Sequence, residues 1–336
     1  MLLKLLAPFI GASCVFVSQV AFAELVTGFE VVVGGNLSAQ SQIQGRTIVG
    51  GNVQGGFPSF GTGLTPAASF SSTDVLVVGG SLQSNGITMQ AGDARLGGTR
   101  GSANVNLNGP GSELFQNDAT AAPRASAATA MLRSASDYFS GLVADSGIIV
   151  NGSNVTFNAA PGADGVAVFD VPAALLTLQN ANFALATAGL PAGTSYIFNV
   201  VGAVTGTPMG NFGAGFQTAD VRSHVLWNFE DQTSPLSLSR EWYGSILLPD
   251  SNLNTTSAIN GGVYVGGDFT TSGDVRLAGY IGHAEYTPSA VPEPSSIILT
   301  ALAGVGLVSA RLRRRSLSRR AAAVQGASAT GTSLSV

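Results

Sequence analysis

The feature of this sequence that most restricts its fold is a short phrase of β-branched residues that leads into a pair of glycines. The phrase occurs as VVVGGNL from Val31, TIVGGNV from Thr47, VLVVGGSL from Val75, ARLGGTR from Ala94 and VYVGGDF from Val263. Val and Ile favour strands, and glycine permits tight corners between strands on different faces. Repetition of a strand-and-corner unit is typical of a β-solenoid, in which each unit stacks on the one before. Because the spacing is irregular, we expect uneven coils.

The composition favours the same architecture. Charged residues make up 10% of the 336 residues and glycine accounts for 44 of them, which suits short strands and turns better than long soluble helices. The only cysteine, Cys14, lies in the first apolar stretch and is expected to leave with it. An exported chain would then carry no disulfide, cysteine nucleophile or thiolate metal site. The net charge of −4 argues against a nucleic-acid partner, which requires a basic face.

One segment between the phrases predicts an α-helix, at residues 121–144. Its apolar residues fall at helical spacing and form one stripe. The stripe consists of Met131, Leu132, Ala135, Tyr138, Phe139, Leu142 and Val143. We expect this helix to pack along a flank or an open end of the solenoid. Further strands are expected at 195–201, 225–229, 244–248 and 259–265, with loops at 206–215 and 232–235.

The N-terminus has the order of a secretory signal peptide. Lys4 is followed by an apolar stretch over 5–20 and by small residues at Ala21 and Ala23. This order predicts cleavage after Ala23 and a signal segment of residues 1–23. The alternative is an uncleaved membrane anchor, but the stretch is interrupted by proline and polar residues and is short for a bilayer.

The C-terminal region combines a proline spacer, an apolar helix and a basic stop. Pro292, Glu293 and Pro294 form the spacer, and residues 295–310 are apolar or small throughout. The arginines that follow are Arg311, Arg313, Arg314 and Arg315. This order predicts a marginal transmembrane helix whose end is held on the cytoplasmic side. The remaining tail, 316–336, is rich in Ala, Ser, Thr and Gly, which is typical of disorder.

Residues 289–315 closely resemble the PEP-CTERM sorting signal of Gram-negative bacteria, because its three parts occur here in the same order. The resemblance implies that an exosortase-type membrane transpeptidase recognises Pro292, Glu293 and Pro294. It also implies a membrane-anchored precursor that is passed to the cell surface or the extracellular matrix. The family usually ends a few residues after its arginines, so the tail beyond Arg315 departs from it. An ordinary C-terminal anchor predicts the same topology without cleavage.

The segment between the two ends, residues 24–288, is expected to form one domain, because no linker or charge block divides it. Over 28–287 it resembles the choice-of-anchor A family of bacterial surface proteins, on the phrases FEVVVGGNL, GRTIVGGNVQGG, VLVVGGSL, FNVVG, VLWNF, GSILLPDSNL and INGGVYVGGDF. The closing part is also distantly similar to the strands of β-solenoid ice-binding proteins. The expected fold is therefore mostly β: an irregular, β-helix-like solenoid with one packed α-helix, a signal helix before it and a transmembrane helix after it.

The sequence predicts no cofactor and no metal site. The glycine pairs lack the G-x-G-x-x-G continuation of a dinucleotide fold, and no G-K-[ST] occurs. The two histidines, His224 and His283, are too far apart in sequence to define a site. Calcium bound by the turn residues Asp268 and Asp274 is a weaker alternative, because hard oxygen ligands suit that ion.

Carboxylates are the only catalytic option, since polysaccharide enzymes on β-helices use them in pairs. The candidates are Asp164 with Asp170, Glu230 with Asp231, Asp268 with Asp274, and Glu241. We expect them at turns and solvated edges rather than in a catalytic cleft. The aromatic residues Trp227, Phe229, Trp242 and Tyr243 are expected in the core, with a sugar-stacking patch as the alternative.

These observations predict an exported structural or adhesive surface protein that contacts extracellular polysaccharide or matrix and is not an enzyme. The two sorting ends and the polar domain between them carry this prediction. A polysaccharide-acting enzyme on a β-helix is the first alternative. An ice-binding module is the second, and it requires regular rows of Thr or Ser, of which only Thr255-Thr256 and Thr270-Thr271 are candidates.

Overall fold

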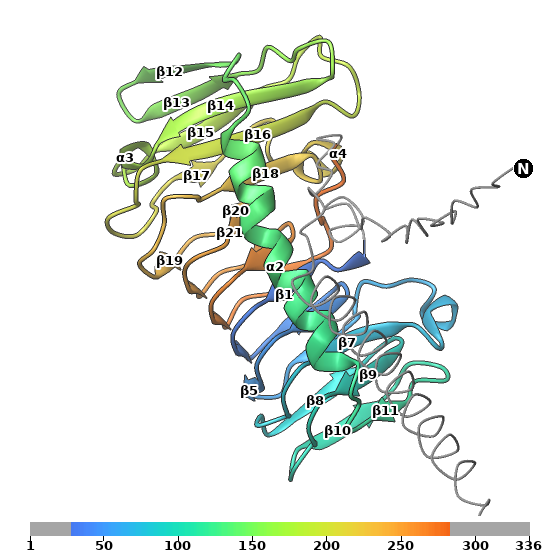
Figure 1. The fold of residues 1–336 in the computed structure, drawn as a ribbon. Helices are drawn as coiled ribbons and strands as arrows, with labels where there is room; N and C mark the ends of the chain where they lie inside the picture. Colours follow the sequence, from blue (N-terminus) through green and yellow to red (C-terminus); the bar gives the residue numbers. More distant parts are fainter. Residues whose placement is uncertain (1–27, 283–336) are drawn as a thin grey trace, which may run out of the picture. The chain divides into compact units, whose positions relative to one another are not determined.

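The computed structural model describes residues 28–282, in which coils of parallel strands are crossed by one long helix (Figure 1). Contacts divide the chain into two units, residues 1–288 and 289–336, and the described residues all belong to the first. The predicted signal segment, sorting segment and C-terminal tail lie outside the described residues. Within residues 28–282, no helix is long and apolar enough to cross a membrane.

Four sheets account for the strands. Sheet A has ten strands in the order β11 (Leu114–Phe115), β9 (Asp93–Leu96), β7 (Asp74–Val78), β4 (Thr47–Val49), β1 (Val31–Val33), β24 (Val263–Val265), β21 (Ser245–Leu248), β18 (Val225–Asn228), β16 (Ser195–Val201) and β14 (Val166–Pro172). Sheet B has five, β19 (Leu236–Leu238), β22 (Leu253–Thr255), β25 (Phe269–Thr271), β2 (Leu37–Ala39) and β5 (Val53–Gly55). Sheet C has seven, β10 (Asn104–Leu107), β8 (Gly86–Met89), β6 (Ser59–Phe60), β3 (Gln42–Ile43), β26 (Val275–Arg276), β23 (Ile259–Asn260) and β20 (Trp242–Tyr243). Sheet D has four, β12 (Gly147–Asn151), β13 (Asn154–Asn158), β15 (Asn182–Ala186) and β17 (Asn211–Phe212).

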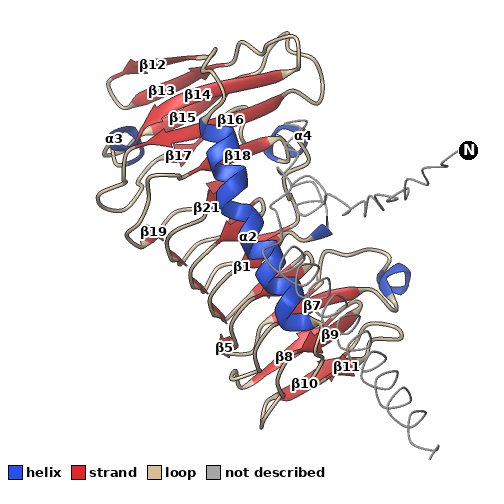
Figure 2. Cartoon of the chain, viewed as in Figure 1, coloured by secondary structure: helices blue, strands red, loops and turns tan. Residues whose placement is uncertain are grey.

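The central coils pass from sheet A through sheet B to sheet C, as β1, β2 and β3 do in the first coil, whereas β14 and β16 are followed by strands of sheet D. Pairing within sheets A, B and C is parallel, as in the register Leu37↔Phe269 of sheet B. The described helices are η1 (Ala67–Phe70), α2 (Ala121–Ser140), α3 (Ala173–Leu176) and α4 (Ala219–Arg222), and Figure 2 shows how short all of them are except α2.

The order of strands in sheet A shows that the chain builds the solenoid from the middle outwards. From β1 it adds β4, β7, β9 and β11 in one direction, and α2 then carries it back along the sheet to the opposite end (Figure 1). From there β14, β16, β18, β21 and β24 return to the starting point. Val31 of the first strand therefore pairs with Val263 of the last coil.

Stacked glycines form the corner between sheets A and B, and they explain the repeated phrase. A Cβ on Gly50 would lie 2.2 Å from the carbonyl oxygen of Gly34, and one on Gly34 would lie 2.2 Å from that of Gly266. Gly79 and Gly97 continue the same stack. The backbones of adjacent coils approach too closely for a Cβ at Gly34, Gly50, Gly79, Gly97 and Gly266, whereas the neighbouring coil of β21 has Pro249 at this corner.

A ladder of polar side chains follows the glycine stack. The side-chain oxygen of Asn36 accepts the backbone N–H of Asn52 at 2.9 Å, and that of Asn52 accepts the N–H of Ser81 at 2.8 Å. In the other direction, Asp268 accepts the N–H of Asn36 at 2.7 Å. Each side chain pairs with a backbone group that the corner would otherwise leave unpaired, which explains the Asn, Ser or Asp after four of the five glycine pairs in the repeated phrase; the fifth pair is followed by Thr99.

Helix α2 packs lengthwise over the outer face of sheet A. Its buried residues are Ala121, Ala125, Ala128, Leu132, Ala135, Ser136 and Phe139. The first three are small, which allows the helix to approach the glycine corners closely: a Cβ on Gly34 would lie 2.7 Å from Thr129 Cγ2. Leu132 and Phe139 join a second apolar cluster with outward residues of the sheet, such as Val32 and Leu226.

Two sequence predictions of element boundaries are wrong. The helix ends at Ser140 rather than at residue 144, because Gly141 caps it, and Val143 is 85% exposed. The strand expected at 259–265 is two strands, β23 and β24, separated by a corner at Gly261. In addition, the expected loop at 206–215 contains the short strand β17.

Candidate functional site

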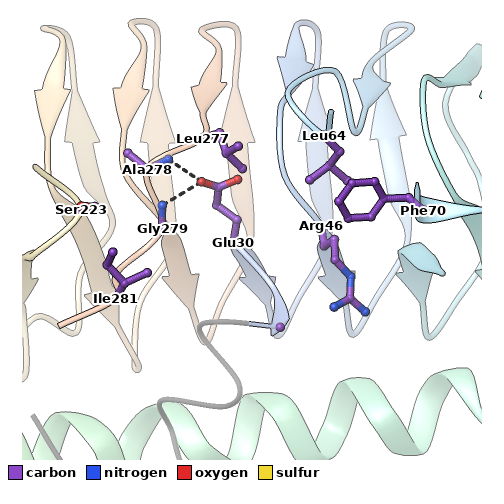
Figure 3. Close-up of a pocket in the computed structure, with 10 residues that line it drawn as sticks. Glu30, Arg46, Leu64, Phe70, Ser223, Leu277, Ala278, Gly279 and Ile281 are labelled. Carbon is purple, nitrogen blue, oxygen red and sulfur yellow. Dashed lines mark hydrogen bonds between the residues drawn. The ribbon is translucent and has the colours of Figure 1, made fainter. Parts of the chain in front are cut away.

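A pocket of about 480 Å³ lies where the first and last coils meet, and its most unusual group is Glu30. Its lining consists of Gly28, Glu30, Arg46, Leu64, Phe70, Ser223, Leu277, Ala278, Gly279 and Ile281. Glu30 Oε1 accepts the backbone N–H groups of Ala278 at 2.6 Å and Gly279 at 2.9 Å (Figure 3). One carboxyl thus joins the residue before β1 to the segment after β26.

The environment of Glu30 favours its neutral form. The side chain is 5% exposed, and burial raises its pKa from 4.5 to about 7, although the two backbone N–H groups act in the opposite direction. Its second oxygen, Oε2, has no hydrogen-bond partner among the described residues and lies against Gly45, where a Cβ would come within 1.7 Å. The site is therefore suited to hold the two ends of the domain together, with apolar walls from Leu64 and Phe70.

A smaller hollow of about 210 Å³ gathers carboxylates at the C-terminal end of α2. Asp170 lies in register with Asn199, and Asn199 lies in register with Asn228. Glu230 and Asp231 follow β18 and line the same hollow. Glu230 and Asp231 are neighbours in sequence and were predicted as a pair. Asp170 lines the same hollow only because strand register aligns β14, β16 and β18, so its place beside them was not predicted.

The asparagines of this hollow attach the helix to the sheet. Asn228 donates to the backbone carbonyl of Ser136 at 3.0 Å and accepts the Ser136 hydroxyl at 2.6 Å. Asn199 donates to the carbonyl of Phe139 at 2.7 Å. No cluster of His, Cys, Asp and Glu within residues 28–282 is suited to hold a metal ion.

A polar strip lies on the outer face of sheet C. We call it the sheet C strip and define it by Glu241, Tyr243, Asn260 and Arg276. Tyr243, Asn260 and Arg276 lie in register on three adjacent strands. Arg276 Nη1 lies 2.7 Å from Glu241 Oε1, and Asn260 Nδ2 donates to the same oxygen at 3.0 Å. The amide of Asn260 and the pairing with Arg276 lower the pKa of Glu241, which keeps it ionised.

Three members of the sheet C strip, Glu241, Tyr243 and Arg276, are partly exposed, whereas Asn260 is buried beneath them. The side chains of Arg276 and Glu241 are 43% and 41% exposed. The strip therefore presents the Arg276 guanidinium as a donor, the Glu241 carboxylate as an acceptor and the Tyr243 ring to the exterior, and the Asn260 amide holds Glu241 from below. Glu241 is recognisable in the sequence only as a carboxylate, and Asn260 and Arg276 are not predicted as its partners, because strand register alone brings the three together.

Sheet B presents a second polar row, which includes the outward residues Ser38, Asn254 and Thr270. Thr270 is exposed, but its neighbours in the row are Ser38 and Asn254. Thr255 and Thr271 point inward and bond the carbonyls of Ser257 and Gly273, both at 2.8 Å. The two threonine pairs of the sequence thus do not form one outward row.

The structure places the remaining predicted residues in supporting roles. Trp227, Phe229 and Trp242 are buried, which confirms the core interpretation, and Tyr243 is partly buried. The ring of His224 is buried, and its Nδ1 lies 2.7 Å from the carbonyl oxygen of Asp220. His283 lies outside the described residues.

The predicted carboxylate pairs Asp164 with Asp170 and Asp268 with Asp274 take part in separate local contacts. Asp164 accepts the N–H of Val166 at 3.1 Å. Asp268 belongs to the ladder at the corner of sheets A and B, whereas Asp274 accepts from Ser41 and from Gln42 before β26. Each of these carboxylates supports a neighbouring turn or coil, as the turn interpretation expects.

Stacked coils of parallel strands around one continuous apolar core define a parallel β-solenoid. Residues 22–293 match the model of the family described as "Putative Ice-binding-like adhesive domain". The chain belongs to this family. Residues 290–315 match the PEP-CTERM protein-sorting motif, a range that includes Pro292, Glu293, Pro294 and the arginine cluster.

Comparison with curated proteins gives no match. Among solved structures, the chain is similar to an ice-binding protein from the Antarctic ascomycete Antarctomyces psychrotrophicus, with 15% identity and a TM-score of 0.41. The similarity covers 76% of this chain and 97% of the other. The choice-of-anchor A resemblance remains a prediction from the sequence.

Proposed function

We propose that this chain is an exported, non-enzymatic adhesive protein whose solenoid contacts extracellular polysaccharide or matrix. The adhesive family and the sorting motif support a protein of the cell surface. The observation that carries the choice of ligand is the sheet C strip, in which the partly exposed Glu241 and Arg276 are fixed across neighbouring coils by each other and by the buried Asn260.

The route to the surface follows from the two ends. A signal peptide cleaved after Ala23 starts export, and the apolar segment 295–310 anchors the precursor in the inner membrane of a Gram-negative bacterium. An exosortase-type transpeptidase then recognises Pro292, Glu293 and Pro294. The match over residues 290–315 supports this step.

The sheet C strip has the chemistry that sugar chains require. Sugars present several hydroxyl groups, each a donor and an acceptor, and bind to planar polar side chains and to aromatic rings. Adjacent strands lie about 4.8 Å apart, so the strip offers such groups at a regular spacing along the solenoid. Because the side chains already hold one another in place, little rotamer entropy is lost on binding.

The test compares variants of the strip with a variant of the opposite face. Glu241→Gln removes the charge at the same side-chain volume, Arg276→Gln replaces the guanidinium by a shorter neutral amide, and Thr270→Ala changes an exposed residue of sheet B. We expect the first two to lose at least about fivefold in co-sedimentation with the host's extracellular polysaccharide, or about 1 kcal/mol, and Thr270→Ala to behave as wild type. Equal binding by all four proteins, with unchanged circular dichroism, rejects the strip as the contact surface.

Ice binding is the second candidate function, and the description of the family supports it. Sheet B is the relevant surface, but its outward row mixes Ser38, Asn254 and Thr270 rather than repeating threonine. Thermal hysteresis of the purified protein distinguishes this function: a hysteresis gap that Thr270→Lys abolishes favours ice binding over polysaccharide adhesion.

A polysaccharide-acting enzyme is the third candidate, since Asp170, Glu230 and Asp231 line one hollow. Its test is the release of reducing ends from the host polysaccharide. Release that disappears in a variant with Asp170→Asn and Glu230→Gln establishes catalysis and contradicts a purely adhesive role.

A further inference from the structure

Strand β12 is an edge strand with unusual exposure of apolar residues. It has the sequence Gly-Ile-Ile-Val-Asn, is the first strand of sheet D, and pairs on one side only, with β13. Ile149 is 58% exposed and Val150 is 48% exposed. Proteins usually protect such edges with charges, prolines or bulges, and β12 has none of these.

The turn after β12 determines which backbone groups face outward. Asn151 pairs with Asn154 across a two-residue turn that begins with Gly152, whose φ is 61°. In a hairpin of this length the residues flanking the turn exchange hydrogen bonds, and every second pair does the same. The N–H and C=O groups of Ile148 and Val150 therefore point away from β13, towards the open edge.

We infer that β12 pairs antiparallel with β12 of a second copy of this chain, with the twofold axis at Ile149. In this register Ile148 lies opposite Val150 of the second copy, and each pair exchanges two backbone hydrogen bonds. Ile149 lies opposite its own copy on the other face. Every opposed pair along the centre of the strand is thus apolar, and the strand is complementary to itself.

Charge does not oppose this contact. Asp145, just before the strand, lies opposite Ser153 of the second copy in the same register, so no like charges face each other. β12 itself carries no charged residue. Only Ile148 packs against the core, yet Ile148, Ile149 and Val150 are all apolar. Self-pairing explains this, because each of these residues then lies opposite another apolar residue, whereas an unrelated partner would not require the strand to be complementary to itself.

The expected contact is weak. Two five-residue strands bury well under the roughly 1,200 Å² of stable complexes. The contact therefore forms only where many copies are displayed at high density, because a high effective concentration compensates for a weak affinity. In this respect the inference rests on the proposed function, since anchored copies on facing cells or in a matrix meet that condition.

Disulfide trapping tests the register. In a chain with Cys14→Ser, the variant Ile149→Cys places two thiols opposite each other at a pair that is not hydrogen-bonded, with Cα atoms about 4.5 Å apart, within the range for a disulfide. The matched control is Asn151→Cys on the same exposed strand, which lies opposite residue 147 of the second copy. We expect at least tenfold more oxidised dimer for Ile149→Cys, both in the purified full chain and on cells. Equal dimer yields, or no dimer from either variant at high concentration, overturn the inference.

A charge variant separates this contact from the proposed function. Ile149→Lys should abolish concentration-dependent association in sedimentation velocity while polysaccharide binding stays as in wild type. Arg276→Gln should lose polysaccharide binding while cross-linking at Ile149→Cys is retained. Association that survives Ile149→Lys contradicts pairing through β12, and it leaves the role of the sheet C strip unaffected.

Discussion

Replacement of Gly50 by alanine is expected to destabilise the centre of the solenoid severely. The new Cβ would meet the carbonyl oxygen of Gly34 at 2.2 Å, and this atom belongs to backbone that cannot rotate away. The two coils would have to separate by about 1 Å, and overpacking of a tight interior costs about 1–3 kcal/mol. The same shift strains the hydrogen bond from Gly50 N–H to the carbonyl of Val33, now 2.7 Å, which contributes about 1 kcal/mol. We expect a loss of about 3 kcal/mol, or roughly 6–12 °C in Tm.

Gly56→Ala is the matched control, because Gly56 belongs to the same coil and a Cβ there would have its nearest neighbour at 3.7 Å. This substitution should be neutral or stabilise by about 0.4–1 kcal/mol, since alanine reduces the freedom of the unfolded chain. Urea unfolding followed by circular dichroism measures both variants. A Gly50→Ala protein as stable as Gly56→Ala would refute the explanation of the glycine phrase as a stacked corner.

Two further substitutions test the contacts that join the first coil to the last and α2 to sheet A. Glu30 has a pKa of about 7 in the folded protein against 4.5 ordinarily, so between these pH values the folded state holds a proton on Glu30 that the unfolded state has released. Protonated Glu30 therefore supports the fold fully below pH 4.5, and this part of the unfolding free energy is lost as pH rises through 7. The unfolding free energy of the wild-type protein should fall by about 3 kcal/mol between pH 4.5 and 7, and in Glu30→Gln this fall should be absent. Urea unfolding at several pH values measures both proteins, and a Glu30→Gln profile identical to wild type contradicts the role of Glu30. Asn228→Ala should cost about 2–4 kcal/mol, because it removes the buried acceptor of the Ser136 hydroxyl and the donor to Asn199 Oδ1. Hydrogen exchange should show early opening of α2, and protection equal to wild type excludes Asn228 as the anchor.

The local parts of the fold could be predicted from the sequence, because they depend on residues close together in the chain. The glycine pairs mark corners since stacked backbone leaves no room for a Cβ, and the stripe with Leu132 and Phe139 marks the face of α2 that packs on sheet A. The boundary errors have local signals too: Gly141 ends the helix, and the first glycine pair of INGGVYVGGDF forms a corner of its own.

The path of the chain could not be predicted from those signals. Each Val-rich strand suits any neighbour in sheet A, so nothing in the phrase itself places Val263 beside Val31, far away in sequence. The sites could not be predicted for the same reason. Asp170 reaches the hollow of Glu230, and Arg276 reaches Glu241, only because pairing aligns distant coils.

The role of this protein as a sorted surface protein is tested most directly by intact-mass analysis of the chain recovered from the envelope and the culture medium of its native host, beside a strain with Glu293→Ala. The account predicts that the wild-type protein lacks residues 1–23 and the residues beyond about Pro294, and that the variant retains its C-terminal segment in the inner membrane. An unprocessed C-terminus in both strains would contradict sorting and leave an ordinary membrane anchor.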